Sequence, residues 1–94
     1  MKREILDEDE ISRRLKNLDG WRADGGQLKK RFTFQNFAES LDFVNRVGAL
    51  AESLDHHPDI TFGWGYAELC TMTHDRGGIT DVDFSLVTKI AELQ

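Results

Sequence analysis

The order of its hydrophobic patterns predicts an α+β fold, a two-layer sandwich in which three helices cover one face of a four-stranded antiparallel sheet. Three segments show helical periodicity, and two pairs of alternating segments lie between them. Each pair is joined by a turn containing glycine, which predicts a hairpin. The order helix, strand, strand, helix, strand, strand, helix is typical of an antiparallel sheet with segregated helices. With 94 residues, the chain is expected to form a single domain, 1–94.

The first helix is expected at about 8–18. Asp7 is a suitable N-cap, and Glu10 three residues later completes a capping-box-like pair. The apolar residues at helical spacing are Ile11, Leu15 and Leu18. The Asp19-Gly20 pair ends the helix.

The first hairpin follows. A short strand is expected over 21–23, a turn over 24–26, which reads Asp-Gly-Gly, and a second strand over 28–34. Phe32 and Phe34 lie two residues apart and therefore point to the same side of the sheet.

The longest helix is predicted over 37–54. Asn36 is its expected N-cap, with Glu39 at the third helical position. A broad apolar stripe runs along it and predicts that it lies across one face of the sheet. The stripe consists of Phe37, Leu41, Val44, Val47 or Gly48, Ala51 and Leu54.

The second hairpin and the last helix complete the fold. Strands are expected over 60–62 and 66–73, joined by a turn at 63–65. In the second of these strands, one face carries 67, 69, 71 and 73. Thr80 and Asp83 form another capping-box-like pair, which predicts a helix beginning after Thr80.

Charge and composition exclude several classes of function. Twelve basic and seventeen acidic residues give a net charge of −5, which disfavours binding to nucleic acids and anionic membranes. The single cysteine, Cys70, allows no internal disulfide. The sequence contains no signal-peptide pattern and no apolar run of the roughly 20 residues that span a bilayer. A cytoplasmic location is expected.

All three histidines fall at the ends of two predicted strands. His56 and His57 stand between the long helix and the third strand, and His74 follows the fourth strand. Neighbouring strand ends can lie side by side, so the three side chains can share one pocket. Histidine is the side chain best suited to proton transfer near neutral pH, so we expect metal-free acid–base chemistry here.

Two other interpretations of the histidines stay open on the residues alone. Three imidazoles with Glu52, Asp55 or Asp75 can bind zinc, although adjacent residues in extended chain point apart and the spacing matches no common zinc motif. The second alternative is that the histidines are solvated residues of a helix end and a loop.

The sequence resembles the pterin-4a-carbinolamine dehydratase family over nearly its whole length, from Gly20-Trp21 through the final helix. The residues that carry the resemblance are 32–37 (FTFQNF), 43–47 (FVNRV), 51–52 (AE), 55–60 (DHHPDI), 73–75 (THD) and 78–80 (GIT). The site pattern of the family is an acid, three residues, His-His-Pro, an aromatic, a distant His and then an Asp. Here it falls on Glu52, His56-His57-Pro58, Trp64, His74 and Asp83.

The resemblance implies a reaction. Members of this family dehydrate a 4a-hydroxytetrahydropterin, the product of aromatic amino-acid hydroxylases, to a quinonoid dihydropterin in the recycling of the tetrahydropterin cofactor. It also implies that no metal or organic cofactor is needed, that the protein is a homodimer or homotetramer, and that its partner is the small pterin substrate. Because some relatives are partner-binding or assembly factors, a non-catalytic scaffold is the alternative function.

The resemblance also assigns roles to residues. The expected catalytic residues are His56, His57 and His74, with His56 and His74 as the acid–base pair. Asp83 and Trp64 are expected to support the site. The expected substrate-binding residues are Glu52, Asp55, His56, His57, Pro58, Thr73, His74, Asp75 and Arg76. The chain departs from the family at 64–67, where it reads Trp-Gly-Tyr-Ala and many members read aromatic-Asn-Lys/Arg-Val.

Overall fold

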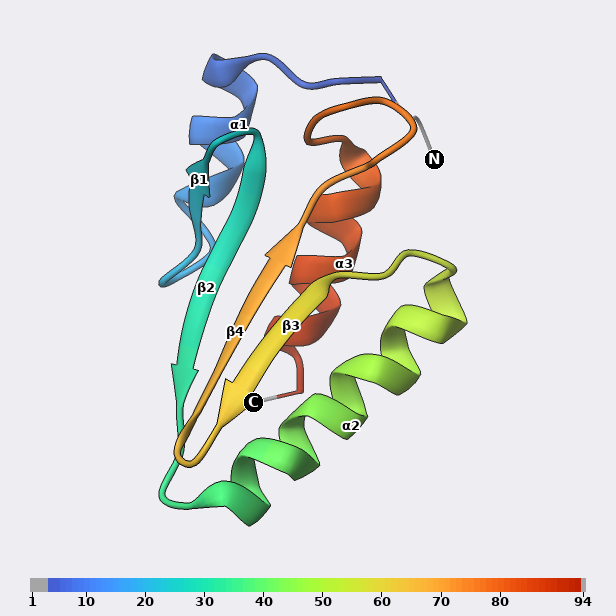
Figure 1. The fold of residues 1–94 in the computed structure, drawn as a ribbon. Helices are drawn as coiled ribbons and strands as arrows, with labels where there is room; N and C mark the ends of the chain where they lie inside the picture. Colours follow the sequence, from blue (N-terminus) through green and yellow to red (C-terminus); the bar gives the residue numbers. More distant parts are fainter. Residues whose placement is uncertain (1–3, 94) are drawn as a thin grey trace.

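A four-stranded antiparallel sheet with helices on one face forms the frame of the protein (Figure 1). The computed structural model describes residues 4–93. The elements are α1 (Glu8–Leu15), β1 (Arg22–Asp24), β2 (Gln27–Thr33), α2 (Phe37–Leu54), β3 (Asp59–Gly63), β4 (Tyr66–Thr71) and α3 (Asp81–Ala91). The strands lie in the order β1-β2-β4-β3. The predicted fold class and element order are confirmed.

The central strand β4 has one buried and one outward face. It pairs with β2 in a register that sets Phe32 opposite Ala67, and with β3 in a register that sets Ile60 opposite Leu69. Ala67, Leu69 and Thr71 are buried beneath the helices. Side chains alternate along a strand, so the residues between them face outward from the open side of the sheet.

The core lies between the sheet and the two longer helices. Phe43 of α2 packs its ring against Phe32 of β2 and against Phe34, which follows that strand, with ring centroids 4.6 and 5.1 Å apart. Both phenylalanines therefore point to the same side of the sheet, as the alternation predicts, and that side carries α2. The other fully or nearly fully buried apolar side chains are Trp21, Leu28, Val47, Ala51, Ala67, Leu69, Ile79, Phe84, Leu86, Val87 and Ile90.

The buried stripe of α2 differs from the predicted one. Its fully buried residues are Ser40, Phe43, Val47 and Ala51, whereas Phe37 and Leu41 are 45% and 39% exposed. The predicted positions Val47 and Ala51 are thus confirmed, and Val44 and Leu54 are partly buried against the core. The difference lies in the first half of the helix. Ser40 can lie in this row because its hydroxyl donates to the carbonyl of Asn36 at 3.2 Å, which satisfies its polar group inside the helix.

The first helix is shorter than predicted and lies at the margin of the core. It ends at Leu15 rather than near Leu18, and none of its residues is fully buried. Arg14 connects it to α3, since its guanidinium lies 2.7 Å from Asp81 and over the ring of Phe84 at 5.3 Å from the centroid. Asp7 caps this helix as expected.

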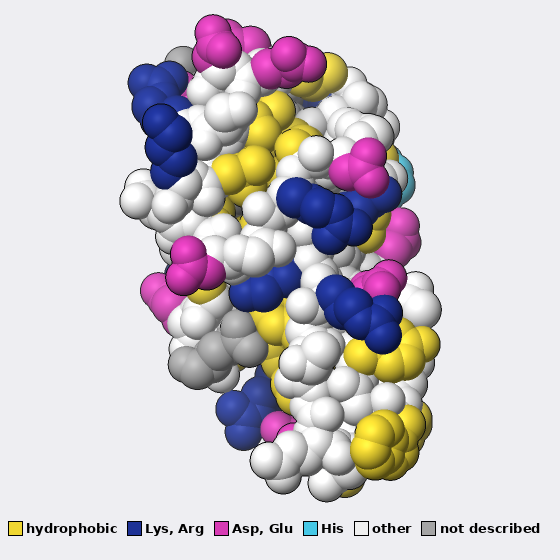
Figure 2. Space-filling model, turned by 90° about the vertical axis from the view of Figure 1, so that its left-hand side faces the viewer, with side chains coloured by type: hydrophobic (Ala, Val, Ile, Leu, Met, Phe, Trp, Pro, Cys, Tyr) yellow, Lys and Arg dark blue, Asp and Glu magenta, His cyan; other side chains and the backbone are white. Residues whose placement is uncertain are grey.

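Charged side chains of both signs are interspersed over the side of the molecule that carries β1 and β2 (Figure 2). Lys29 lies 3.4 Å from Asp24, and Arg31 forms an ion pair with Glu68 across the sheet. The basic run 29–31 is thus partly neutralised by local partners. No helix within residues 4–93 is long and apolar enough to cross a membrane.

Truncation of the core is expected to be costly. Leu86 is fully buried, so Leu86→Ala should lower the free energy of unfolding by about 2–5 kcal/mol through lost burial and the cavity left behind. Leu41→Ala, at an exposed site, should change it by less than about 1 kcal/mol. Urea denaturation of both variants measures the difference, and equal losses would contradict the different burial of the two side chains.

Candidate active site

The end of α2 directs the first two histidines to opposite sides. Asp55 adopts the left-handed conformation, with φ 51° and ψ 42°. Its amide donates to the carbonyl of Glu52 at 3.2 Å, and the amide of His56 donates to the carbonyl of Ala51 at 3.1 Å. This pair of bonds is a Schellman motif, which satisfies the last carbonyls of the helix and reverses the chain. His56 is thereby placed beneath the helix end.

His56 and His57 each lie against a different carboxylate. The His56 ring is 7% exposed, and its Nε2 lies 2.6 Å from Oδ1 of the fully buried Asp83. The His57 ring is exposed, and its Nε2 lies 2.8 Å from Oε2 of the exposed Glu52. Consecutive residues in extended chain point apart, and Pro58 favours that extended backbone at His57. The histidine pair is therefore one inner and one outer imidazole.

The carboxylate of Asp83 is surrounded by hydrogen-bond donors. Its Oδ1 accepts from the hydroxyl of Thr71 at 2.7 Å, and its Oδ2 accepts from the hydroxyl of Thr73 at 2.8 Å. The amide of Thr80 donates to Oδ2 at 3.0 Å. The same contact closes the capping box of α3, which confirms the predicted helix start at Thr80. One carboxylate therefore joins β4, the start of α3 and the end of α2.

His74 lies in a turn at the same end of the sheet. The turn spans 74–77 and is closed by the pairing of Thr73 with Gly78. Asp59 at the start of β3 pairs with Cys70 near the end of β4, so the turn and the His56–His57 segment leave the same end of neighbouring strands (Figure 1). His74 is exposed, and it follows directly after Thr73, which bonds Asp83. The backbone of His74 therefore lies at the end of the sheet that also carries the His56–His57 segment.

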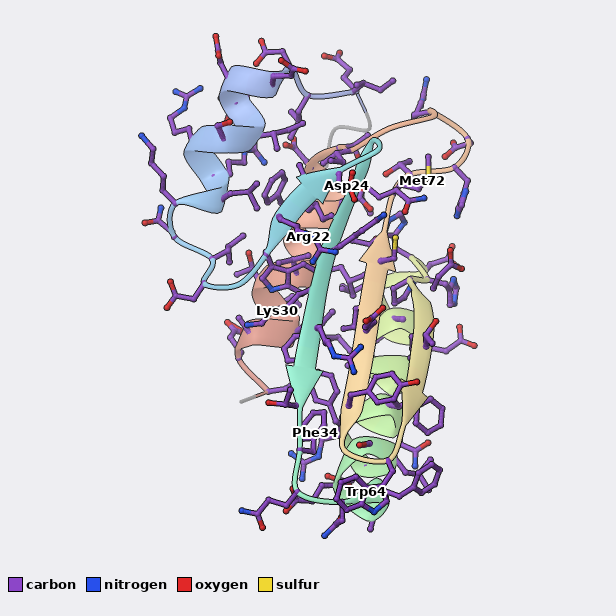
Figure 3. The ribbon with its side chains drawn as sticks, turned by 60° about the vertical axis from the view of Figure 1, so that its left-hand side comes forward. Arg22, Asp24, Lys30, Phe34, Trp64 and Met72 are labelled. Carbon is purple, nitrogen blue, oxygen red and sulfur yellow. The ribbon has the colours of Figure 1, made fainter. Side chains whose placement is uncertain are left out.

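The other expected site residues divide into two groups. Asp55 and Pro58 flank the two histidines, and Asp75 and Arg76 lie exposed in the turn beside His74. Trp64 is at the opposite end of the sheet, 71% exposed in the turn after β3. At about 3.3 Å per residue it lies about 17 Å along the strand from Asp59, and Figure 3 shows Trp64 and Met72 at opposite ends. Within this chain, Trp64 is thus not brought to the histidines.

Sequence reasoning missed Thr71 as part of this cluster. Thr71 at the end of β4 and Thr73 two residues beyond it continue the row of Ala67 and Leu69, and both are buried. A buried hydroxyl needs a hydrogen-bond partner. Two threonines at core positions of one strand are therefore the signal that a buried acceptor lies opposite them.

The side chains of the candidate site are not arranged as a metal centre. Among residues 4–93, no three histidine, cysteine, aspartate or glutamate side chains are placed to hold a metal ion together. His56 and His57 face different directions for the reason given above. The zinc alternative is therefore not favoured by the placement of the donor side chains.

The family of the chain follows from its match to known proteins. A family model described as pterin 4 alpha carbinolamine dehydratase matches residues 4–93. The chain belongs to this family. A protein of Rubrobacter xylanophilus provisionally named pterin-4-alpha-carbinolamine dehydratase is 49% identical over 86 residues, which are 90% of this chain and 80% of that protein. A protein of the same provisional name from Sulfolobus acidocaldarius is 44% identical over 95% of this chain and 98% of its own.

Solved structures agree with the family. A crystal structure described as a transcriptional coactivator/pterin dehydratase from Brucella melitensis matches with a TM-score of 0.90 and 29% identity, covering 96% of this chain and 98% of that one. A pterin dehydratase-like protein described as a RuBisCO assembly factor in the alpha-carboxysome matches with a TM-score of 0.64 and 23% identity, covering 78% and 84%. The second likeness concerns the fold alone.

The left-handed residue beside the histidines offers a test of local strain. Replacing Asp55 by glycine removes a cost of about 1–2 kcal/mol for a side chain in this conformation, and the extra unfolded-state entropy of glycine offsets about 0.5–1 kcal/mol. Asp55→Gly should therefore raise the free energy of unfolding by about 0.5–1 kcal/mol. Asp55→Ala keeps the strained Cβ and should not stabilise. Urea denaturation compares the two, and a less stable glycine variant would count against the strain.

Proposed function

We propose that this protein is a 4a-hydroxytetrahydropterin dehydratase, a lyase that forms quinonoid dihydropterin and water in the recycling of the tetrahydropterin cofactor of aromatic amino-acid hydroxylases. The observation that carries the proposal is the buried His56–Asp83 pair, which lies beside the exposed His57–Glu52 pair in a member of this family. An imidazole held by a carboxylate is a group arranged for proton transfer.

The reaction needs one proton donor and one proton acceptor. Hydroxide is a poor leaving group, so the oxygen on C4a must receive a proton as the C4a–O bond breaks. The proton on N5 must leave as the C4a=N5 double bond forms. The products are water and the quinonoid dihydropterin, with no net oxidation or reduction. The acid and the base return to their starting states by exchanging protons with solvent or with each other, and such positioned groups contribute about 10²–10⁴-fold each.

In this proposal His56 and His74 are the acid–base pair. Asp83 fixes the His56 ring at 2.6 Å, and the exposed position of His74 leaves its ring open to the substrate. His57 is mainly a substrate-binding group, held by Glu52. Asp55, Pro58 and the segment from Thr73 to Arg76 supply the remaining contacts to the pterin.

The protein is proposed to act in the cytoplasm as a homodimer or homotetramer. The edge strands β1 and β3 each have a neighbour on one side only in the four-stranded sheet. Unpaired edges are commonly protected by association or by charge. This supports self-association and does not select between the two oligomers.

A second candidate is a scaffold that stabilises an assembly of another protein. It is favoured by the name of the Brucella structure, which joins a coactivator role to the enzyme, and by a group of apolar side chains at one end of the sheet. Phe37 and Trp64 are exposed there, and the ring of Phe37 lies 5.7 Å from that of Phe62. A scaffold role predicts a stable complex in pull-downs that survives His56→Ala.

The dehydratase proposal is tested by stopped-flow measurement of 4a-hydroxytetrahydropterin breakdown. The pure protein should accelerate it well above the buffer rate, and His74→Ala should lower kcat by about 100-fold or more while the fold is retained. Glu68→Ala, an exposed change on the open face of the sheet, is the matched control and should keep full activity. A wild-type protein without acceleration would end the proposal.

A further inference from the structure

Three donors other than His56 surround Asp83 in the buried cluster. The side chain is fully buried, and its two oxygens accept hydrogen bonds from the hydroxyls of Thr71 and Thr73 and from the amide of Thr80. The His56 ring lies 2.6 Å from Oδ1. An ionised carboxylate only accepts hydrogen bonds. Burial of such a charge is tolerated only where donors replace the lost water, and here Oδ1 has the donor Thr71 while Oδ2 has the donors Thr73 and the Thr80 amide.

Counting donors fixes the direction of the bonds behind the carboxylate. Thr73 has a single hydroxyl proton and gives it to Asp83. Its 2.7 Å contact with the hydroxyl of Thr80 must then be donated by Thr80. The hydroxyl of Thr80 in turn accepts from the amide of Val82 at 3.2 Å. The bonds therefore run one way, from the helix amide through two hydroxyls to the carboxylate, and such chains strengthen one another.

The same reasoning assigns the proton on His56. Because Asp83 accepts only, Nε2 of His56 must carry the hydrogen in their 2.6 Å bond. The neutral ring is then the Nε2–H tautomer, with a lone pair on Nδ1. Within residues 4–93, Nδ1 of His56 is not one of the fully buried side-chain nitrogen or oxygen atoms that lack a hydrogen-bond partner. Nδ1, which has no partner among those residues, therefore lies where the ring reaches the surface.

We propose that Thr71 and Thr73 are positioning residues that hold Asp83 as an acceptor and thereby make Nδ1 the nitrogen of His56 that gains and loses the proton. The assignment holds whether His56 acts as the acid or as the base, because Nε2 keeps its hydrogen in both states. The catalytic part rests on the proposed dehydratase function. The tautomer does not, since it follows from the hydrogen bonds alone.

The tautomer is measured by long-range ¹H–¹⁵N correlation spectra of the ¹⁵N-labelled protein without substrate. The neutral His56 ring should show a protonated Nε2 and an unprotonated Nδ1, assigned by the loss of its signals in His56→Gln. A protonated Nδ1, or an averaged mixture of tautomers such as a solvated ring gives, overturns the proposal whether or not the protein is a dehydratase.

The role of the threonine hydroxyls is measured with Thr71→Val and Thr71→Ser. Loss of a hydrogen bond to a charged acceptor should reduce kcat about tenfold in Thr71→Val, with KM little changed, and should broaden the His56 signals into a tautomer mixture. Thr71→Ser should restore both. Thr61→Val, the same change on the exposed part of β3, is the matched control and should leave both unchanged.

The outcomes separate the two proposals. If the wild-type chain is inactive but His56 shows the Nε2–H tautomer and Thr71→Val disturbs it, the dehydratase function fails and the positioning role stands. If the chain is active but Thr71→Val keeps the wild-type kcat and the wild-type spectrum, the positioning role of Thr71 is overturned. Thermal denaturation shows whether each variant is folded under the conditions of the assay.

Discussion

The hydrogen bond between His56 and Asp83 is the contact on which the rest of the site depends. It joins the turn that ends α2 to the first turn of α3. The hydroxyl of Thr71 donates to the same carboxylate and so connects the central strand β4 to both helices. Three elements that are distant in sequence therefore share one acceptor. The position of the inner histidine is set by this shared acceptor rather than by its own loop.

A buried polar cluster is an expensive feature in a domain of 94 residues, because a small domain buries a modest share of its surface. A carboxylate without donors would cost several kcal/mol at this position. The cluster avoids that cost because hydrogen-bond donors contact both oxygens. One of these bonds, from the amide of Thr80, also closes the capping box of α3. The cap, the strand and the imidazole are thus stabilised together, and the loss of one partner is expected to disturb the others.

The outer part of the candidate site differs from the Asp83 cluster in its exposure to solvent. His57, Glu52 and His74 are exposed, and an exposed ion pair contributes little to stability. Stability therefore does not explain the presence of these exposed side chains, whereas His56 has a structural role through its bond to Asp83. In the proposed active site, the buried His56 is the fixed group, and the exposed His57 and His74 are the groups that can adjust to a bound molecule.

The sequence by itself determined the order of the seven elements, the three helix caps and the extent of the longest helix, because these depend on side chains within a few residues of one another. Asp7, Asn36 and Thr80 each bond an amide two or three positions ahead. The alternation in β4 likewise grouped Ala67, Leu69 and Thr71 on one face, and the packing of the helices makes that face the buried one. The family pattern named the histidines and Asp83, but it did not say which imidazole each carboxylate contacts.

Only the tertiary structure decided the buried row of α2, the position of Trp64 and the membership of the Asp83 cluster. Adjacent stripes on a helix are equally periodic, so packing against the sheet selects Ser40 and Phe43 over Phe37 and Leu41. The direction of β3 takes Trp64 to the far end of the sheet from the histidines. Thr71 meets Asp83 because strand pairing and helix packing bring together residues twelve positions apart. A contact of that kind depends on the relative placement of whole elements, which local sequence patterns do not encode.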